Sequence, residues 1–427
     1  MRPSTVRCAV EAVTIFVATS VAVLAIMLPI SFASLASSVH VDLLVFNVPR
    51  AMTGGAFMAV ITGAVTVAIG GVRTARWTAL LALACILLNH LTLANSSTDG
   101  LDGLSLPTLN FIDALLAGIV VGALAVAVWG EPLLRTVHIF AMLGATILGD
   151  LTQSPTDADS DGLSGALGGT MPLWFIAASV LTLAYFALTT PAPPRTTAEN
   201  AIPLAPVFAA LIAFTTTIVT ALAVAAHKTS APYLIIASIV VIAAAVVAAL
   251  ILPGRDGILL LLMSGFSVAG SLVVTLPRSG WIDLATLATT AVALWFGIRT
   301  PRPLVAAAGV FALACFVFAT DIVHPHAGLT AALGCLALGA VAGYCLGTSV
   351  PISPTAGVVG LATLFVPSVG VALSDSDFGH LAYSSSWYRT SEVDRGFGPG
   401  AVAMVVALGC AIAVWSLMHH RPATPQP

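Results

Sequence analysis

Charged residues are scarce in this sequence. Only 8% of its 427 residues are Asp, Glu, Lys or Arg, and of its 15 basic residues only Lys228 is a lysine. Soluble globular domains carry about 25% charged residues, so this composition excludes a soluble protein, and nothing in it indicates nucleic-acid binding. With 59% hydrophobic residues and a mean hydropathy of +1.05, the chain is predicted to be an all-α polytopic membrane protein.

Motifs of soluble catalysis are missing as well. The sequence has no phosphate-binding glycine loop, no nucleophile elbow and no Cys-x-x-Cys pair, so we expect no enzymatic activity. Its six cysteines form no framework for disulfides or metal binding. Five of them lie inside apolar runs and are predicted to be small buried side chains: Cys85, Cys315, Cys335, Cys345 and Cys410.

Long apolar runs fill most of the chain. A transmembrane helix needs roughly 20 apolar residues, and about fourteen runs meet that requirement. The predicted spans are 10–32, 51–70, 77–95, 110–130, 134–152, 172–190, 203–226, 232–252, 257–276, 281–299, 303–323, 327–347, 352–373 and 399–418.

A short arginine motif occurs twice between apolar runs. Its residues are Gly71, Arg73 and Arg76 in the first copy and Gly297, Arg299 and Arg302 in the second. Two weaker echoes flank it in the same order, 48–50 with 276–278 and 82–85 with 312–315. We interpret these matches as an internal duplication, with two parallel six-helix repeats and an inserted helix pair.

Basic residues set the expected orientation. With a cytoplasmic N-terminus, ten of the fifteen fall on the inner side, and both arginine motifs face the cytoplasm. An even number of spans then places both termini inside a bacterial inner membrane. The predicted domains are an N-terminal six-helix bundle at 1–190, a cytoplasmic linker with the inserted pair at 191–256, and a C-terminal six-helix bundle at 257–427.

This arrangement resembles the major facilitator superfamily, in particular its fourteen-helix drug:proton antiporter branch. That family places a glycine, an Asp-Arg pair and further basic residues after the second helix of each half. Here the glycine and two arginines match, while Thr74 and Thr300 stand near the place of the acid. The antiporter glycine run of the fifth helix is matched at 141–149 without its proline. The resemblance implies secondary transport, proton coupling and efflux from the cell.

Few ionisable groups lie near the predicted spans. Asp113 and Asp283 are candidates for substrate binding or coupling, because the resemblance implies that their helices line a central cavity. Each lies near a helix end, so an interfacial carboxylate in water is the alternative. His138 is a third candidate, against a hydrogen-bonded packing role.

Hydroxyl groups and small residues occupy the middle of the spans instead. Serine and threonine can bond to their own helix backbone, so most are expected to be packing residues, and a cavity that they line suits an amphipathic or lipid-like solute. The glycine pairs Gly118-x-x-x-Gly122 and Gly339-x-x-x-Gly343 predict close helix contacts.

Two outer loops carry further candidates. Asp157, Asp159 and Asp161 alternate before Gly162, as in the first half of a calcium loop, although Gly168 replaces the expected glutamate. The sequence is compatible with a Ca²⁺ site at 157–162 and with an acidic, solvated loop that binds no cation. The loop at 374–398 is an interfacial cap or a contact for an envelope protein.

Three functions remain in view. The first is a secondary transporter that exports a small amphipathic or lipid-like solute across the lipid bilayer by alternating access. The second is a non-transporting scaffold or subunit of a cell-envelope complex. The third is a glycosyltransferase for lipid-linked sugars, for which the first outer loop offers only Asp42 near His40.

Overall fold

The chain is described by a computed structural model. The described residues are 5–28, 38–69, 71–95, 106–152, 171–189, 202–227, 231–273, 281–323, 327–373 and 398–421. All regular structure within these ranges is helical, as the composition predicted.

Helices occur at all fourteen predicted spans. The first seven are α1 (Thr5–Met27), α2 (Ser38–Ile69), α3 (Gly71–Asn95), α4 (Leu106–Val128), α5 (Pro132–Thr152), α7 (Leu173–Thr189) and α8 (Leu204–His227). The remainder are α9 (Ala231–Ile251), α10 (Gly257–Val273), α11 (Trp281–Arg299), α12 (Pro303–Val323), α13 (Ala327–Thr348), α14 (Pro354–Ala362), η1 (Thr363–Phe365), α15 (Val369–Leu373) and α16 (Gly398–His420). Among the described residues, eleven helices are long and apolar enough to cross a bilayer, and three apolar helices are shorter. The protein is therefore an all-α, multi-pass membrane protein.

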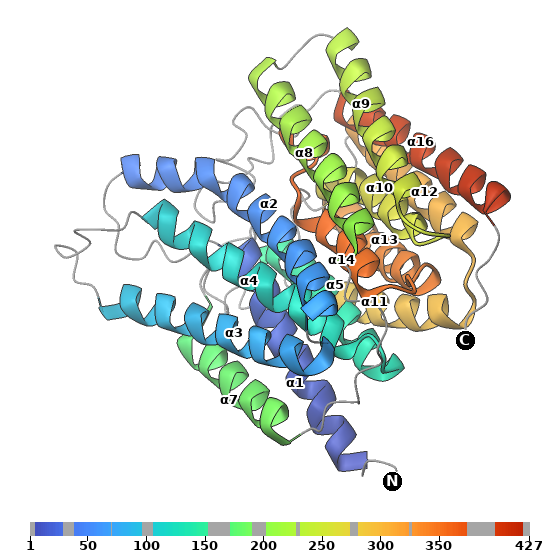
Figure 1. The fold of residues 1–427 in the computed structure, drawn as a ribbon. Coiled ribbons are helices and arrows are strands. Elements are labelled where there is room, and N and C mark those ends of the chain that lie inside the picture. Colours follow the sequence, from blue (N-terminus) through green and yellow to red (C-terminus); the bar gives the residue numbers. More distant parts are fainter. Residues whose placement is uncertain are drawn as a thin grey trace.

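Two sets of six helices repeat the same packing pattern. In the first set, α2 packs along α4, α1 packs on α5, and α3 packs on α7. In the second set, α11 packs along α13, α10 packs on α14 and α15, and α12 packs on α16. Figure 1 shows the first set in blue to green on one side and the second in yellow to red on the other.

Glycines bring the second and fourth helices of each set into backbone contact. A Cβ atom added to Gly118 or Gly122 of α4 would lie 3.0 Å from the Cα of Gly55 or Ala59 in α2. A Cβ atom added to Gly343 of α13 would lie 2.9 Å from a backbone nitrogen of α11. Both predicted small-residue contacts are confirmed, because only glycine leaves room at these crossings.

The pair α8 and α9 stands apart from this pattern. The two helices pack on each other; α8 also contacts α2 and α15, and α9 contacts α10 and α16. Arg421 donates to the carbonyls of Leu250 and Leu252 at the end of α9, and Arg255 donates to the carbonyl of Met418 near the end of α16. These arginines donate hydrogen bonds to carbonyls that have no partner within their helix, and their positive charge complements the negative end of the helix dipole. The contacts attach α9 to the second set.

Two predicted span boundaries are wrong. α2 begins at Ser38 and continues through Pro49, so Asp42 and His40 belong to a helix and not to an outer loop. The span predicted at 352–373 is broken into α14, η1 and α15. Val366 is extended, with φ −90° and ψ 117°, because the ring of Pro367 disfavours helical geometry in the residue before it.

The two arginine motifs occupy different places relative to their helices. Gly71 begins α3 with a φ of +65°, whereas Gly297 lies inside the last turn of α11. A Cβ atom added to Gly297 would lie 2.8 Å from the carbonyl oxygen of Tyr344. Both motifs connect the second and third helices of a set, but they are not superimposable residue by residue. The predicted spans put the first motif in a connection between helices, which is wrong for Arg76, because it lies within α3 and is 6% exposed.

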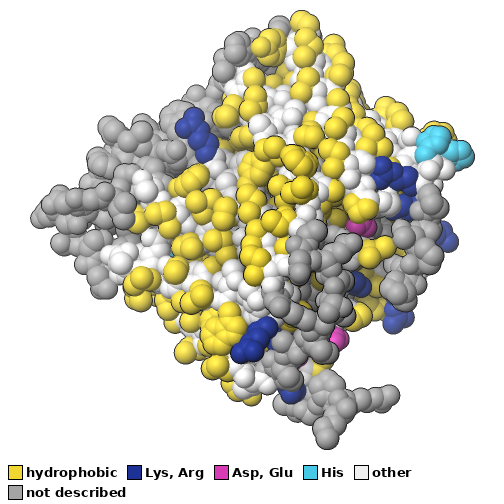
Figure 2. Space-filling model, in the orientation of Figure 1, with side chains coloured by type: hydrophobic (Ala, Val, Ile, Leu, Met, Phe, Trp, Pro, Cys, Tyr) yellow, Lys and Arg dark blue, Asp and Glu magenta, His cyan; other side chains and the backbone are white. Residues whose placement is uncertain are grey.

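The surface suits a lipid environment. Hydrophobic side chains dominate the face drawn in Figure 2, and charged side chains are few there. Large apolar side chains such as Trp174, Leu181 and Leu329 are each more than two thirds exposed. Apolar exposure on this scale is expected where acyl chains replace water.

Candidate functional site

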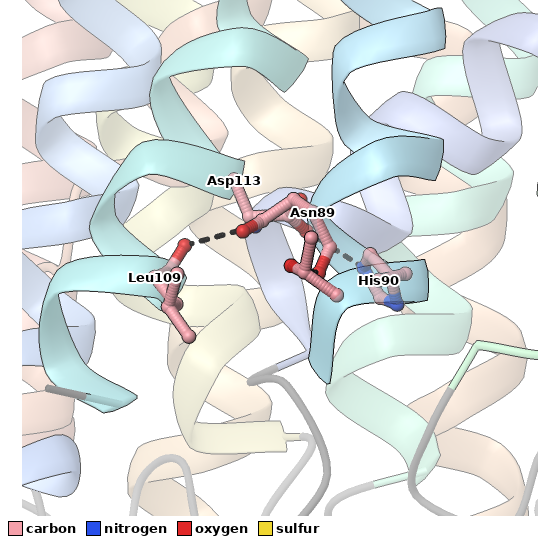
Figure 3. A network of polar contacts seen from close by, with 5 residues as sticks. Asn89, His90, Leu109 and Asp113 are labelled. Atoms are coloured by element: carbon pink, nitrogen blue, oxygen red, sulfur yellow. Dashed lines mark hydrogen bonds and ion pairs between the residues drawn. The ribbon is translucent and has the colours of Figure 1, made fainter. Parts of the chain in front are cut away.

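Asp113 lies at the centre of a buried polar network between α3 and α4. Its Oδ1 accepts a hydrogen bond from Asn89 Nδ2 at 3.1 Å, and its Oδ2 lies 3.0 Å from His90 Nε2. Asn89 also donates to the carbonyl of Leu109, one turn earlier on α4. Figure 3 shows Asp113 and Leu109 on one helix facing Asn89 and His90 on its neighbour.

Burial makes this network costly to disrupt. Asp113 is 1% exposed and the side chain of His90 is 12% exposed, so the carboxylate has exchanged water for protein donors. The interfacial interpretation of Asp113 is therefore wrong. Its carboxylate is directed at α3 within the first set, where Asn89 and His90 supply the hydrogen bonds that a buried carboxyl group needs.

Asp283 is also buried. It lies in the first turn of α11, where a carboxylate complements the positive helix end, and it is 1% exposed. The water-exposed alternative is wrong here too, because the Asp283 side chain is buried in a helix that packs along α13. The structure places Asp113 and Asp283 on different sets of helices and does not bring them into one cluster.

His138 is the third candidate and the most enclosed. Its ring lies between α5 and α1, fully buried, with Nδ1 2.8 Å from the Thr19 hydroxyl. Its Nε2 is buried without a hydrogen-bond partner. Leaving a buried polar atom without a partner costs about 1–3 kcal/mol, so Nε2 is an unusual feature of the α1–α5 interface.

Most other buried hydroxyls are satisfied by their own helices. Thr146 donates to the Met142 carbonyl, and Thr286 and Thr290 donate to carbonyls one turn earlier on α11. The predicted packing role of these residues is confirmed. Thr19 differs, because its hydroxyl faces an imidazole on another helix.

The repeated arginines have diverged. Arg73 is exposed, while the Arg76 guanidinium is turned inward and lies 4.4 Å from the ring centroid of Phe186 on α7. In the second copy, Arg299 and Arg302 are both exposed. The first motif thus joins α3 to α7 through Arg76, whereas both arginines of the second motif remain on the surface.

A contact between the two sets of helices was missed by sequence reasoning. Trp129, directly after α4, donates from its indole nitrogen to the Pro351 carbonyl before α14, at 3.2 Å. Its ring lies against the Cα of Gly357, where an added Cβ would clash. On the predicted orientation this contact lies on the cytoplasmic side. A tryptophan at a helix end usually indicates an interfacial anchor, so its position in the sequence did not reveal the buried contact.

Asp256, between α9 and α10, binds the backbone that leads into α14. Its carboxylate accepts hydrogen bonds from the backbone amides of Ile352 at 3.1 Å and Ser353 at 3.4 Å. Ser353 caps α14 by accepting from the amide of Ala356. Burial raises the pKa of the Asp256 carboxyl, and the two amide hydrogen bonds oppose that shift. The segment that receives Trp129 is thus fixed within its own set of helices.

The proposed calcium ligands Asp157, Asp159 and Asp161 lie outside the described residues, as does 374–397 of the second outer loop. Within the described part of the chain, no group of three or more His, Cys, Asp or Glu side chains is placed to hold a metal ion. The Ca²⁺ site and the envelope contact stay predictions.

No protein-family model and no curated protein matches the chain. Among solved structures, the chain is similar to the Escherichia coli fucose:proton symporter FucP, with 14% identity, a TM-score of 0.47, and coverage of 97% of this chain and 98% of that chain. It is also similar to the Escherichia coli xylose transporter XylE in a partially occluded inward-open conformation. That match has 13% identity, a TM-score of 0.46, and coverage of 97% of this chain and 98% of that chain.

Proposed function

We propose that the protein is a secondary active transporter that exports a small amphipathic or lipid-like solute by alternating access. In this proposal 1–190 and 257–427 are two six-helix bundles, and 191–256 contributes the linker and the inserted pair α8–α9. The membrane is the bacterial inner membrane, with both termini in the cytoplasm. The observation that carries the proposal is the repeated helix packing, because transporters that work by alternating access are commonly built from two such repeats around a shared site.

The interface between the two sets supports this arrangement. The second helix of each set contacts the fifth helix of the other, in the pairs α2 with α14 and α5 with α11. The fourth and fifth helices contact in the same reciprocal way, in the pairs α4 with α14 and α5 with α13. Such reciprocal contacts allow one bundle to rock against the other around a pseudo-twofold axis.

Trp129 is the proposed inner latch. It makes a single neutral hydrogen bond across the interface, worth about 0.5–1.5 kcal/mol, and packs on a glycine. A contact of this strength is easily broken and re-formed. The described conformation would then be closed on the cytoplasmic side.

His138 is the proposed solute or proton contact, since its Nε2 is orphaned on the helix that touches α11 and α13. The Asp113–His90 pair and Asp283 are proposed coupling groups, because each is a buried carboxylate that can hold a proton. Hydroxyl-bearing and alkyl side chains around them suit an amphipathic solute better than a multivalent ion.

Spin-label distances test alternating access without a known substrate. In a cysteine-free variant, one label pair replaces the exposed residues Glu131 and Ile352 at the inner ends, and a second pair replaces Thr108 and Trp281 at the outer ends. We expect two populations whose inner and outer distances change in opposite directions, with Trp129→Leu enriching the inner-open one. A single distance in each pair, unaffected by Trp129→Leu at pH 5 and pH 8, would favour the scaffold.

Transport itself is tested in proteoliposomes with ethidium and a fluorescent phospholipid as amphipathic probes, with and without a pH gradient. We expect gradient-dependent flux of at least one probe that falls at least tenfold in His138→Phe. His419→Phe, at the exposed end of α16, is the matched control. Equal flux in wild type, His138→Phe and empty vesicles for both probes would refute export of this solute class.

A further inference from the structure

Arg299 and Arg302 form an exposed basic pair at the turn between α11 and α12. The Arg299 guanidinium lies 4.3 Å from the ring centroid of Trp295, whose side chain is 54% exposed. Within the described part of the chain, neither guanidinium has a hydrogen bond or an ion pair. Each guanidinium carries five N–H donors, so the turn presents a concentration of unused donors.

Three other arginines of the described part of the chain contact the protein itself. Arg255 and Arg421 bond to carbonyls at helix ends, and Arg76 lies over Phe186. Only the second copy of the repeated motif therefore keeps both of its arginines on the surface. Because these side chains contribute little to packing, their arrangement is better suited to an external anion than to stability.

The surroundings of the pair are apolar and exposed. The exposed large side chains on the two adjoining helix ends are Phe296, Ile298, Leu304 and Val305. In a bilayer such side chains face acyl chains while arginine reaches the headgroup level. A free inorganic anion would gain nothing from this apolar flank, whereas a lipid would contact both parts.

Local geometry favours a phosphate over a point charge. The contact with the face of the Trp295 ring positions the Arg299 guanidinium and uses none of its N–H donors, which stay available for bidentate contact with phosphate oxygens. Arg302 directly precedes α12, and its own carbonyl accepts the amides of Val305 and Ala306. The positive end of the α12 macrodipole therefore lies beside the same turn.

We propose that Trp295, Arg299 and Arg302 form a binding site for the headgroup of an anionic phospholipid. On the predicted orientation it lies in the cytoplasmic leaflet. The proposal requires only that the helices cross a bilayer, so it stands independently of transport. A zwitterionic lipid would bind less tightly, because its ammonium group meets two guanidinium groups.

Native mass spectrometry of the detergent-purified protein tests the site. Dioleoylphosphatidylglycerol, dioleoylphosphatidylcholine and inorganic phosphate are titrated separately against wild type and the double variant Arg299→Gln, Arg302→Gln. Each basic residue near an anionic surface contributes on the order of a fivefold factor, so we expect ~25-fold weaker phosphatidylglycerol binding in the double variant. In wild type, phosphatidylcholine is expected to bind more weakly than phosphatidylglycerol, and its affinity should change less with the substitutions.

Arg73→Gln is the matched control, because Arg73 is the exposed arginine of the other copy. It should keep phosphatidylglycerol affinity within about twofold of wild type. Trp295→Leu should lose about threefold, since an exposed cation–π contact contributes modestly. The proposal is overturned if the double variant binds phosphatidylglycerol like wild type, if Arg73→Gln loses as much, or if inorganic phosphate competes with the lipid.

Discussion

The α2–α4 pair and the α11–α13 pair have the same packing but different chemistry. In both, glycines of the fourth helix contact the backbone of the second. Beside α4, however, lie the ionisable groups Asp113 and His90, whereas the facing residues of α11 are Thr286 and Thr290, bonded to their own helix. The comparison indicates that the scaffold was retained in both halves, each of which buries one carboxylate, Asp113 on α4 and Asp283 on α11. The first half adds a network that joins Asp113 to Asn89 and His90 of α3.

Among the substitutions that compare the two halves, removing the Asp113 carboxylate should cause the largest loss of stability. Asp113→Leu leaves His90 Nε2 without its acceptor and Asn89 with only the Leu109 carbonyl, and each of these two losses costs about 1–3 kcal/mol. Thr286→Val in the second half should cost about 1 kcal/mol or less, because its carbonyl partner keeps its helix bond. Melting temperatures in detergent measure both; equal losses would contradict the proposed asymmetry.

Glycine substitutions test the symmetry of the scaffold and should give intermediate effects. Gly122→Ala and Gly343→Ala each insert a methyl group into a helix backbone, and overpacking typically costs about 1–3 kcal/mol. Gly130→Ala is the control, because an added Cβ there has no atom within 4 Å. Similar losses of melting temperature in both halves support equivalent crossings. A large loss in one half alone would show that the two crossings are not equivalent.

Helix positions and glycine crossings could be predicted from the sequence because they depend on local pattern. Apolar run length identified the spans, and four-residue glycine spacing identified the crossings. The break at Pro367 was also encoded locally, but the continuous apolar run around it indicated a full span. The length of an apolar run indicates a span, but it does not report the break that a proline imposes on the residue before it.

Partners between helices could not be predicted in the same way. The burial of Asp113 depends on Asn89 and His90 facing it from α3, and the inward turn of Arg76 depends on Phe186 of α7. These contacts join residues that are 23 to 110 positions apart, so no periodicity in either helix reports them. The sequence identifies His138 as an ionisable residue within a predicted span. That its Nε2 has no hydrogen-bond partner depends on the packing of α1 against α5, which the sequence does not reveal.

The starts of the two fifth helices give the finest comparison and the smallest expected effect. α5 begins at Pro132 after the exposed Glu131, while α14 begins at Pro354 above the buried Asp256. Because burial raises the pKa of Asp256 in the folded protein, the protonated carboxyl is favoured by folding. The contribution of Asp256 to stability is therefore fully present below the pKa that its carboxyl has in the unfolded chain. It is lost as the pH rises through the pKa of the same carboxyl in the folded protein.

Asp256→Asn should remove this pH dependence, since the amide oxygen still accepts a backbone hydrogen bond without carrying charge. Melting temperatures between pH 3.5 and pH 7 should fall more steeply with rising pH in wild type than in Asp256→Asn, by a few degrees at most. Glu131→Gln, at the exposed carboxylate before α5, is the comparison variant. If wild type instead gained stability relative to Asp256→Asn as pH rose, the two amide hydrogen bonds would outweigh burial, and Asp256 would be an anchor of the ionised form.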